Sequence, residues 1–209
     1  MTFHSCAELA QGRTSPLAGA KTIPIQGWNC TGPVFAGLIA EAKPKIIIEV
    51  GTWLGASAFT MAKAAPEARL YCMDTWLGNI DHYFHASDPV NDLFPVNGYP
   101  SIYYKFLDNM VATGMAGRIF PVPNTSLTGS RLLARAGIFA ELIYIDASHE
   151  YDDVYADLCA YRSLLAPGGI LFGDDFRDFP GVTHAVLRFK YEYNLDLKVD
   201  GPTWILREK

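Results

Sequence analysis

Four short segments of the chain place polar or glycine residues directly after an apolar run of strand length. They are residues 49–57, 74–76, 146–150 and 174–175. In a sheet of parallel strands the carboxyl ends meet at one edge, and ligands bind in the crevice there. We therefore expect these four segments to form a single site.

The first segment is a glycine turn between a strand and a helix. Gly51 and Gly55 allow the backbone to approach a ligand closely, and the helix that begins near Ala56 offers free N–H groups to an anion such as a carboxylate. A tight turn without a ligand is the alternative. Because an indole, Trp53, stands where a pyrophosphate site needs a glycine, the turn favours a nucleotide without phosphates.

The second and third segments supply a carboxylate and a histidine. Asp74 ends the second strand, where an acid can accept both hydroxyls of a ribose, although a helix cap or a loop acid is equally compatible with its position. His149 follows the strand that ends at Asp146, and an imidazole with an ordinary pKa near 6.5 suits proton transfer. A capping or surface histidine is the alternative.

The fourth segment adds two adjacent acids. Asp174 and Asp175 end a further apolar strand, and adjacent carboxylates are costly to bring together unless a cation or donors compensate. With Asp146 from another strand end, three carboxylates can converge on a hard divalent cation, magnesium or a similar ion. Neither cysteines nor a histidine cluster joins them, so zinc is not expected.

The elements that must position these residues alternate along the chain. Strands are expected at residues 45–50, 69–74, 119–122, 142–146 and 169–174, and helices at 31–42, 56–65, 102–114, 127–136, 150–165 and 182–193. Residues 195–199 and 203–206 flank a turn too short for a crossover helix, which indicates an antiparallel hairpin. The pattern predicts an α/β, Rossmann-like, doubly wound and mostly parallel seven-stranded sheet with a C-terminal antiparallel hairpin.

The chain length and composition bound the class of protein. A chain of 209 residues with half of them apolar predicts one globular domain, with residues 1–27 as an extended lead-in and residues 77–100 as an inserted segment that caps the site. The net charge of -5 without a basic block argues against nucleic acid and favours a small-molecule partner. No apolar run reaches membrane-spanning length and the first residues lack a secretion signal, so we expect no membrane partner and a cytoplasmic protein. A homo-oligomer is left open.

These segments, taken together, resemble class I S-adenosylmethionine-dependent methyltransferases. The resemblance rests on Glu-Val-Gly-Thr-Trp-Leu-Gly-Ala-Ser at 49–57, Met-Asp-Thr-Trp-Leu-Gly at 73–78, Ile-Asp-Ala-Ser-His-Glu-Tyr at 145–151, Leu-Ala-Pro-Gly-Gly at 165–169 and Gly-Asp-Asp at 173–175. Within that class the chain is most similar to small O-methyltransferases of the catechol and caffeoyl-coenzyme A type and to relatives that act on bacterial natural products and sugars. The resemblance therefore implies methylation of a small-molecule hydroxyl such as that of a sugar, a phenol or a natural product.

The resemblance also implies a role for each site residue. The methionine end of the cofactor would lie against Gly51, Gly55 and Ser57, with Glu49 supporting the loop and Trp53 forming a wall. Asp74 would hold the ribose and Trp76 would border the adenine, and the remaining cofactor residues would be Thr75, Ser126 and Asp146.

The same resemblance assigns the catalytic base and the metal ligands. His149 stands where the catechol-type enzymes have a lysine that takes the proton of the attacking hydroxyl. Asp146, Asp174 and Asp175 would bind the divalent ion, and their oxygen ligands favour magnesium. Many catechol-type enzymes have Asn where this chain has Asp175. A nicotinamide-dependent oxidoreductase and a catalytically inactive nucleotide-binding module are the alternative functions. Trp53 and the terminal hairpin argue against the first, and His149 with the three acids argues against the second.

Overall fold

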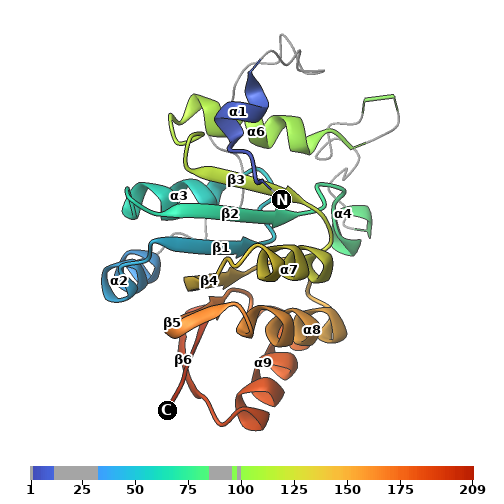
Figure 1. Cartoon of the computed structure of the whole chain (residues 1–209). Helices are drawn as coiled ribbons and strands as arrows, with labels where there is room; N and C mark the ends of the chain where they lie inside the picture. The colour runs from blue at the N-terminus through green and yellow to red at the C-terminus, as the bar shows by residue number, and fades with distance from the viewer. Residues whose placement is uncertain (1, 12–32, 85–95, 98–99) are drawn as a thin grey trace.

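The computed structural model describes residues 2–11, 33–84, 96–97 and 100–209 (Figure 1). Its helices are α1 (Cys6–Ala10), α2 (Pro33–Ala42), α3 (Ala56–Ala64), α4 (Ile80–Phe84), α6 (Ile102–Ala112), α7 (Ser126–Arg135), α8 (Tyr151–Arg162) and α9 (Pro180–Glu192). Its strands are β1 (Ile46–Val50), β2 (Arg69–Asp74), β3 (Ile119–Pro123), β4 (Ala140–Ile145), β5 (Leu165–Gly173), β6 (Asp196–Asp200) and β7 (Thr203–Arg207).

The seven strands form one sheet in the order β3-β2-β1-β4-β5-β7-β6. Strands β1 to β5 pair in parallel, and β7 is antiparallel to both β5 and β6. The chain reverses its direction of winding between β1 and β4, which is where an open α/β sheet forms a crevice for a ligand. The predicted fold class, a mostly parallel sheet that ends in an antiparallel hairpin, is confirmed.

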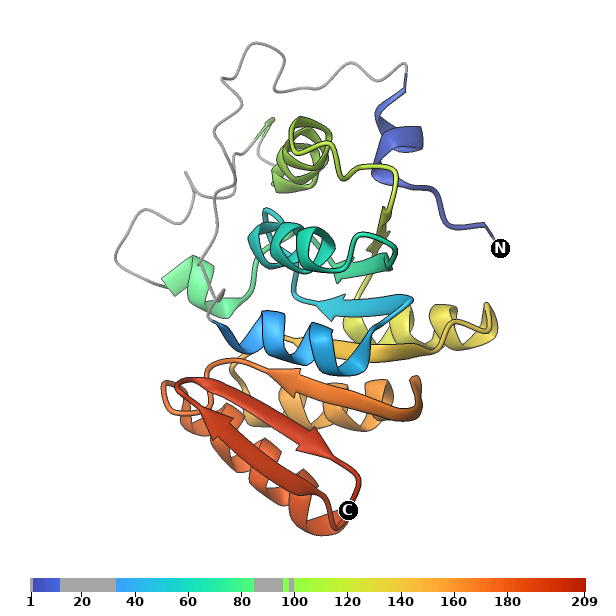
Figure 2. The same cartoon turned by 90° about the vertical axis from the view of Figure 1, so that its left-hand side faces the viewer.

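Helices cover both faces of the sheet. In Figure 2 the helices α2, α3 and α6 lie in front of the strands, whereas α8 and α9 lie behind them. One core includes Phe35, Met61 and Phe106 from the front helices, and the second includes Leu158 and Phe189 from the rear helices. Strand side chains alternate between the two cores, so Ile47 belongs to the first and Ile48 to the second, as expected for strands buried on both faces.

Helix α1 and the end of helix α8 differ from the sequence prediction. Within the predicted extended lead-in, residues 6–10 form α1, which Ser5 and Glu8 cap through mutual hydrogen bonds. The remainder of that lead-in from residue 12, and most of the predicted cap segment, lie outside the described residues. Helix α8 ends at Arg162 instead of residue 165 because Leu165 pairs with Ala140, which extends β5 backward through a register shift.

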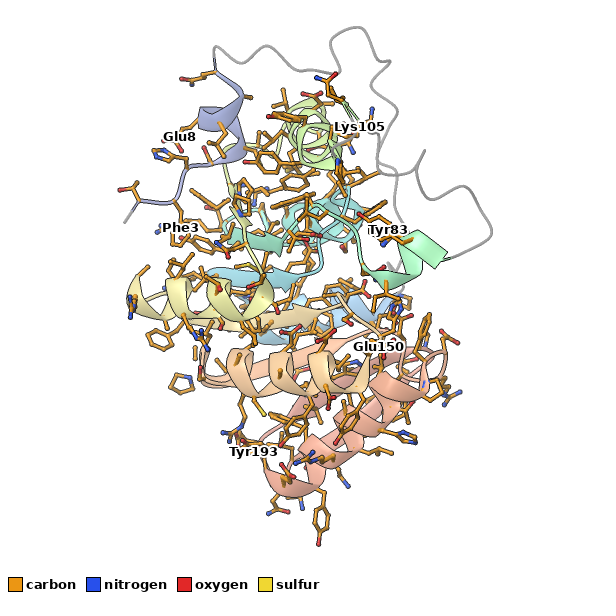
Figure 3. All side chains as sticks on the ribbon, turned by 90° about the vertical axis from the view of Figure 1, so that its right-hand side faces the viewer. Phe3, Glu8, Tyr83, Lys105, Glu150 and Tyr193 are labelled. Atoms are coloured by element: carbon orange, nitrogen blue, oxygen red, sulfur yellow. The ribbon has the colours of Figure 1, made fainter. Side chains whose placement is uncertain are left out.

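The carboxyl ends of the parallel strands lie on one side of the molecule. Helix α4, which the sequence did not predict, lies at this edge in Figure 2, near the arrowheads of the parallel strands. Figure 3 shows Tyr83 of α4 and Glu150 at the start of α8 on the same side. Within the described ranges, no helix has the length and apolar character needed to cross a bilayer.

Candidate active site

The glycine turn is wedged against the end of the neighbouring strand β4. Gly51 has φ of +88°, and a Cβ atom on it would lie 1.9 Å from the backbone oxygen of Asp146. The backbone continues the sheet here, since the Gly51 N–H donates to the Met73 oxygen and the Asp146 N–H donates to the Val50 oxygen, each at 2.8 Å. Only glycine fits this position, which brings the first and third predicted segments into direct contact.

Glu49 supports the turn from inside the protein. Its side chain is fully buried and accepts hydrogen bonds from the hydroxyls of Thr52, at 2.8 Å, and Ser57, at 2.5 Å. Burial raises the pKa of Glu49 to about 7, against the opposing effect of the two hydroxyls. This geometry fits the predicted role of Glu49 in supporting the loop. The hydroxyl of Ser57, which was expected to contact the methionine end of the cofactor, donates instead to Glu49.

Asp74 organises the same turn from the end of β2. Its Oδ2 accepts the backbone N–H groups of Thr52, at 2.9 Å, and Trp53, at 2.7 Å, and its Oδ1 accepts the N–H of Trp76 at 2.7 Å. Burial raises the pKa of Asp74, and these three donors act in the opposite direction. Asp74 therefore joins the glycine turn to the loop after β2.

The two tryptophans of the site have different surroundings. Trp53 is partly exposed, and its backbone oxygen accepts the indole N–H of Trp76 at 2.8 Å. The Trp76 ring is only 2% exposed and packs against Tyr103 and Phe106, so most of it belongs to the core. Thr75 is exposed, and its hydroxyl accepts the N–H of Leu77.

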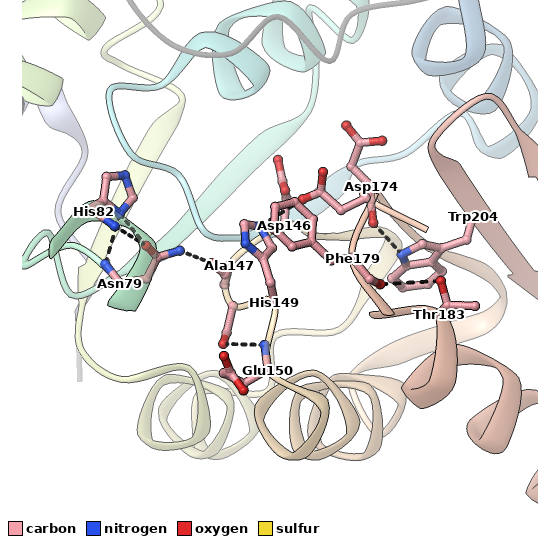
Figure 4. Close-up of polar contacts among 12 residues, drawn as sticks. Asn79, His82, Asp146, Ala147, His149, Glu150, Asp174, Phe179, Thr183 and Trp204 are labelled. Atoms are coloured by element: carbon pink, nitrogen blue, oxygen red, sulfur yellow. Dashed lines mark hydrogen bonds and ion pairs between the residues drawn. The ribbon is translucent and has the colours of Figure 1, made fainter. Parts of the chain in front are cut away.

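His149 is held on two sides. Its Nε2 lies 3.0 Å from Oδ2 of Asp175, and its ring stacks on Phe179 with 3.7 Å between the ring centroids (Figure 4). The backbone beyond it is tight as well, because a Cβ on Gly181 would lie 2.2 Å from the His149 oxygen. The structure thus joins the predicted base to one of the predicted metal ligands.

The three predicted metal ligands line one small pocket. Asp146, Asp174 and Asp175 surround it together with apolar side chains that include Val154 and Trp204. Burial, followed by repulsion from Asp175, raises the pKa of Asp146, although the Tyr144 hydroxyl donates to that carboxylate at 2.8 Å.

The three acids are not arranged as a ligand set for a divalent ion in this structure. Among the residues that the structure describes, no group of three or more His, Cys, Asp and Glu side chains is placed to hold a metal. One oxygen of Asp175 is directed at His149, and Oδ1 of Asp174 lies 3.5 Å from the Thr203 hydroxyl. The acids share a pocket without forming a ligand set.

Ser126 lies apart from the strand-end acids, at the first residue of α7. Its backbone oxygen accepts the Tyr161 hydroxyl at 2.9 Å, and its side chain hydrogen-bonds to Asp157 of α8. The loop after β3 is therefore braced by α8, and the predicted contact of Ser126 with the cofactor stays a prediction.

Helix α4 and Asn79 just before it make contacts with the site that the sequence reasoning did not predict. Asn79 donates from its side-chain amide to the Ala147 oxygen at 3.1 Å, and His82 stacks on Trp53 with 4.1 Å between ring centroids. Phe179, which stacks on His149, was also missed. The residues around Asn79 carried only general turn signals, and no local pattern links them to β4.

The seven-stranded order and the glycine turn at the β1 end define the fold of class I S-adenosylmethionine-dependent methyltransferases. A family model described as a methyltransferase domain matches residues 48–176, which is more than half of the chain. The chain belongs to this methyltransferase domain family.

One curated relative is the uncharacterized protein y4gI of Sinorhizobium fredii. It is 22% identical over 156 residues, which cover 73% of this chain and 15% of the relative. The chain thus spans about 15% of the length of the curated relative that it matches.

Solved structures show the same fold at low identity. An O-methyltransferase from Bacillus cereus in complex with SAH is 14% identical with a TM-score of 0.61, covering 92% of this chain and 86% of that one. TomG, an O-methyltransferase from Streptomyces achromogenes involved in tomaymycin synthesis, is 16% identical with a TM-score of 0.60, covering 85% and 79%. CalS11, a TDP-rhamnose 3′-O-methyltransferase of calicheamicin biosynthesis, is 22% identical with a TM-score of 0.58, covering 83% and 77%.

Proposed function

We propose that this chain transfers a methyl group from S-adenosylmethionine to a hydroxyl oxygen of a small molecule such as a sugar, a phenol or a natural product. The observation that carries the proposal is the His149–Asp175 pair, which lies beside a glycine turn in contact with Asp146. The pair offers a base at the strand edge where the family fold binds its cofactor. The acceptor atom is supported by the solved neighbours, which are themselves O-methyltransferases.

The residues of the glycine turn fit the cofactor. Helix α3 begins after Gly55 without a side-chain cap, so its first N–H groups suit a carboxylate such as that of methionine. Oδ1 of Asp74 receives one backbone donor, and a carboxylate oxygen can accept another hydrogen bond, here from a ribose hydroxyl. When bound, S-adenosylmethionine supplies an electrophilic methyl group on a sulfonium.

In the proposed reaction His149 accepts a proton from the acceptor hydroxyl. Asp175, whose Oδ2 lies 3.0 Å from Nε2, would orient the ring and stabilise the imidazolium that forms. Bound S-adenosylmethionine would supply the methyl group to the acceptor oxygen, while His149 would take the proton that this oxygen loses. Alignment of the two reactants can supply about 7 to 11 kcal/mol of the barrier, and a base roughly 10² to 10⁴ in rate.

The divalent ion is a separate proposal, taken from the sequence. Three carboxylates share one pocket, where burial and then repulsion from Asp175 raise the pKa of Asp146, and a cation would relieve that repulsion. Since the described side chains do not form a ligand set, no step of the reaction depends on an ion here. Methyl transfer in the presence of excess chelator, with and without added magnesium, tests this proposal.

The experiment that tests the function is calorimetry with S-adenosylhomocysteine, followed by transfer of a labelled methyl group to a panel of sugars and phenols. We expect binding of the homocysteine product and labelling of at least one acceptor. Binding of NAD in its place would favour the oxidoreductase. Binding without any transfer across the panel would favour the inactive module.

A further inference from the structure

Trp53 has a strained backbone in the middle of the glycine turn. Its φ of +50° lies in the left-handed region, which bulky residues rarely adopt because it is strained for them. Such a conformation persists only where the surroundings fix it. The backbone is fixed by Asp74, which accepts its N–H, and by Trp76, which donates to its oxygen.

The indole ring of Trp53 is fixed by a third contact. It stacks on the imidazole of His82 with 4.1 Å between centroids and 17° between the ring planes. Trp53 is in the β1 turn and His82 is in α4, so the contact joins two segments that are distant in the sequence. Aromatic stacking restricts both rings in a way that backbone hydrogen bonds cannot.

The imidazole is itself held by Asn79. Nδ1 of His82 lies 2.5 Å from the side-chain oxygen of Asn79, and the backbone N–H of His82 donates to the same oxygen at 3.2 Å. The side-chain amide of Asn79 then donates to the Ala147 oxygen at 3.1 Å, directly after Asp146 (Figure 4). Trp53, His82, Asn79 and Ala147 thus connect the end of β1 with the end of β4.

We propose that His82 is a positioning residue for cofactor binding, which holds Trp53 in the orientation that closes the cofactor side of the site. The inference rests on the proposed function, since it concerns the same S-adenosylmethionine pocket. A turn whose bulky residue is fixed before binding loses less conformational freedom when the ligand arrives. The α4 segment therefore contributes to cofactor affinity through Trp53.

The test measures the affinity for S-adenosylhomocysteine by calorimetry and the melting temperature of each variant. We expect His82→Ala to weaken binding about three- to tenfold, the range that the loss of one aromatic pair implies. His82→Phe keeps a stacking ring and should restore most of the affinity. His184→Ala, a change at an exposed histidine on α9, is the matched control and should bind as the wild type does.

A double-mutant cycle separates action through Trp53 from a general loss of structure. If His82 acts through Trp53, adding His82→Ala to Trp53→Ala should cost no further affinity. Unchanged binding in His82→Ala, or equal losses in His82→Phe and His82→Ala, would overturn the inference while leaving the proposed function intact. Failure of the wild-type chain to bind S-adenosylhomocysteine would overturn both.

Discussion

The imidazole Nε2 of His149 and the carboxylate Oδ2 of Asp175 lie 3.0 Å apart, although the two residues follow different strands. Asp175 has φ of +65°, a conformation that Asp tolerates better than most residues. Phe179 covers the face of the imidazole. The ring is thus oriented by a carboxylate and an aromatic face, as expected for a base that must meet a hydroxyl in one geometry.

His149→Ala should lower kcat by roughly 10² or more and leave the affinity for S-adenosylhomocysteine nearly unchanged, because a base acts mainly in the transition state. Asp175→Asn should lower kcat less, since the amide can still contact the ring but carries no charge. Methyl transfer to the acceptor found by panel screening, with parallel calorimetry, measures both effects. A near-normal kcat in His149→Ala would mean that the base is another group.

Asp74→Ala should weaken binding of S-adenosylhomocysteine by a few kcal/mol, because hydrogen bonds to a charged group are each worth about 1.5 to 3. The same variant should unfold at a lower temperature, since three backbone N–H groups lose their acceptor. Asp74→Asn retains one acceptor oxygen and should have an intermediate effect. Calorimetry and thermal unfolding give the two readouts, and unchanged affinity in Asp74→Ala would remove this residue from the site.

Gly51→Ala should destabilise the fold by more than about 1 kcal/mol, because φ is positive there and the new Cβ would meet the Asp146 oxygen at 1.9 Å. Gly37→Ala in α2 is the matched control. Apart from the backbone of α2 itself, no atom of the residues that the structure describes lies within 4 Å of a Cβ built there, and alanine in a helix interior is favoured by about 1 kcal/mol. Urea unfolding of both variants measures the difference, and equal stabilities would contradict the role assigned to the turn.

The sheet could be predicted from sequence because its strands are buried on both faces. The continuous apolar run at β1 and the glycines after it fix a strand and its turn without any tertiary information. Helix α4 has only five residues and no apolar period; His82 within it contacts Trp53, and Asn79 just before it contacts Ala147. The start of β5 was missed for a similar reason, since pairing of Leu165 with Ala140 overrides the helical spacing.

The sequence was sufficient to predict which types of residue form the site and which strand ends carry them. Topology brings Asp146, His149 and Asp175 to one edge, as the spacing indicated. The sequence does not determine the hydrogen-bond or ion-pair partner of each carboxylate. Asp175 contacts His149, and Asp74 accepts backbone N–H groups. Both contacts depend on side-chain directions that are set by packing in the folded protein.

Asp157 lies in α8, away from the strand-end acids, and it should make the stability of the fold depend on pH. Its side chain in α8 is only 3% exposed, and burial raises its pKa to about 7 against the effect of its hydrogen bond to Ser126. A raised pKa in the folded state means that folding favours the protonated acid. Its contribution to stability is therefore fully present below its unfolded pKa of about 4 and is lost as the pH rises through about 7.

Asp157→Asn should remove this dependence, because the amide stays neutral. Relative to the wild type, the variant should gain stability between pH about 5 and about 8. The free energy of unfolding in urea at both pH values measures that gain, and Glu49 and Asp146, whose raised pKa values act in the same direction, remain in both proteins. Asp152→Asn, an exposed change in the same helix, should show no comparable gain. A constant difference between Asp157→Asn and the wild type across this range would mean that Asp157 is ionised in the folded protein throughout.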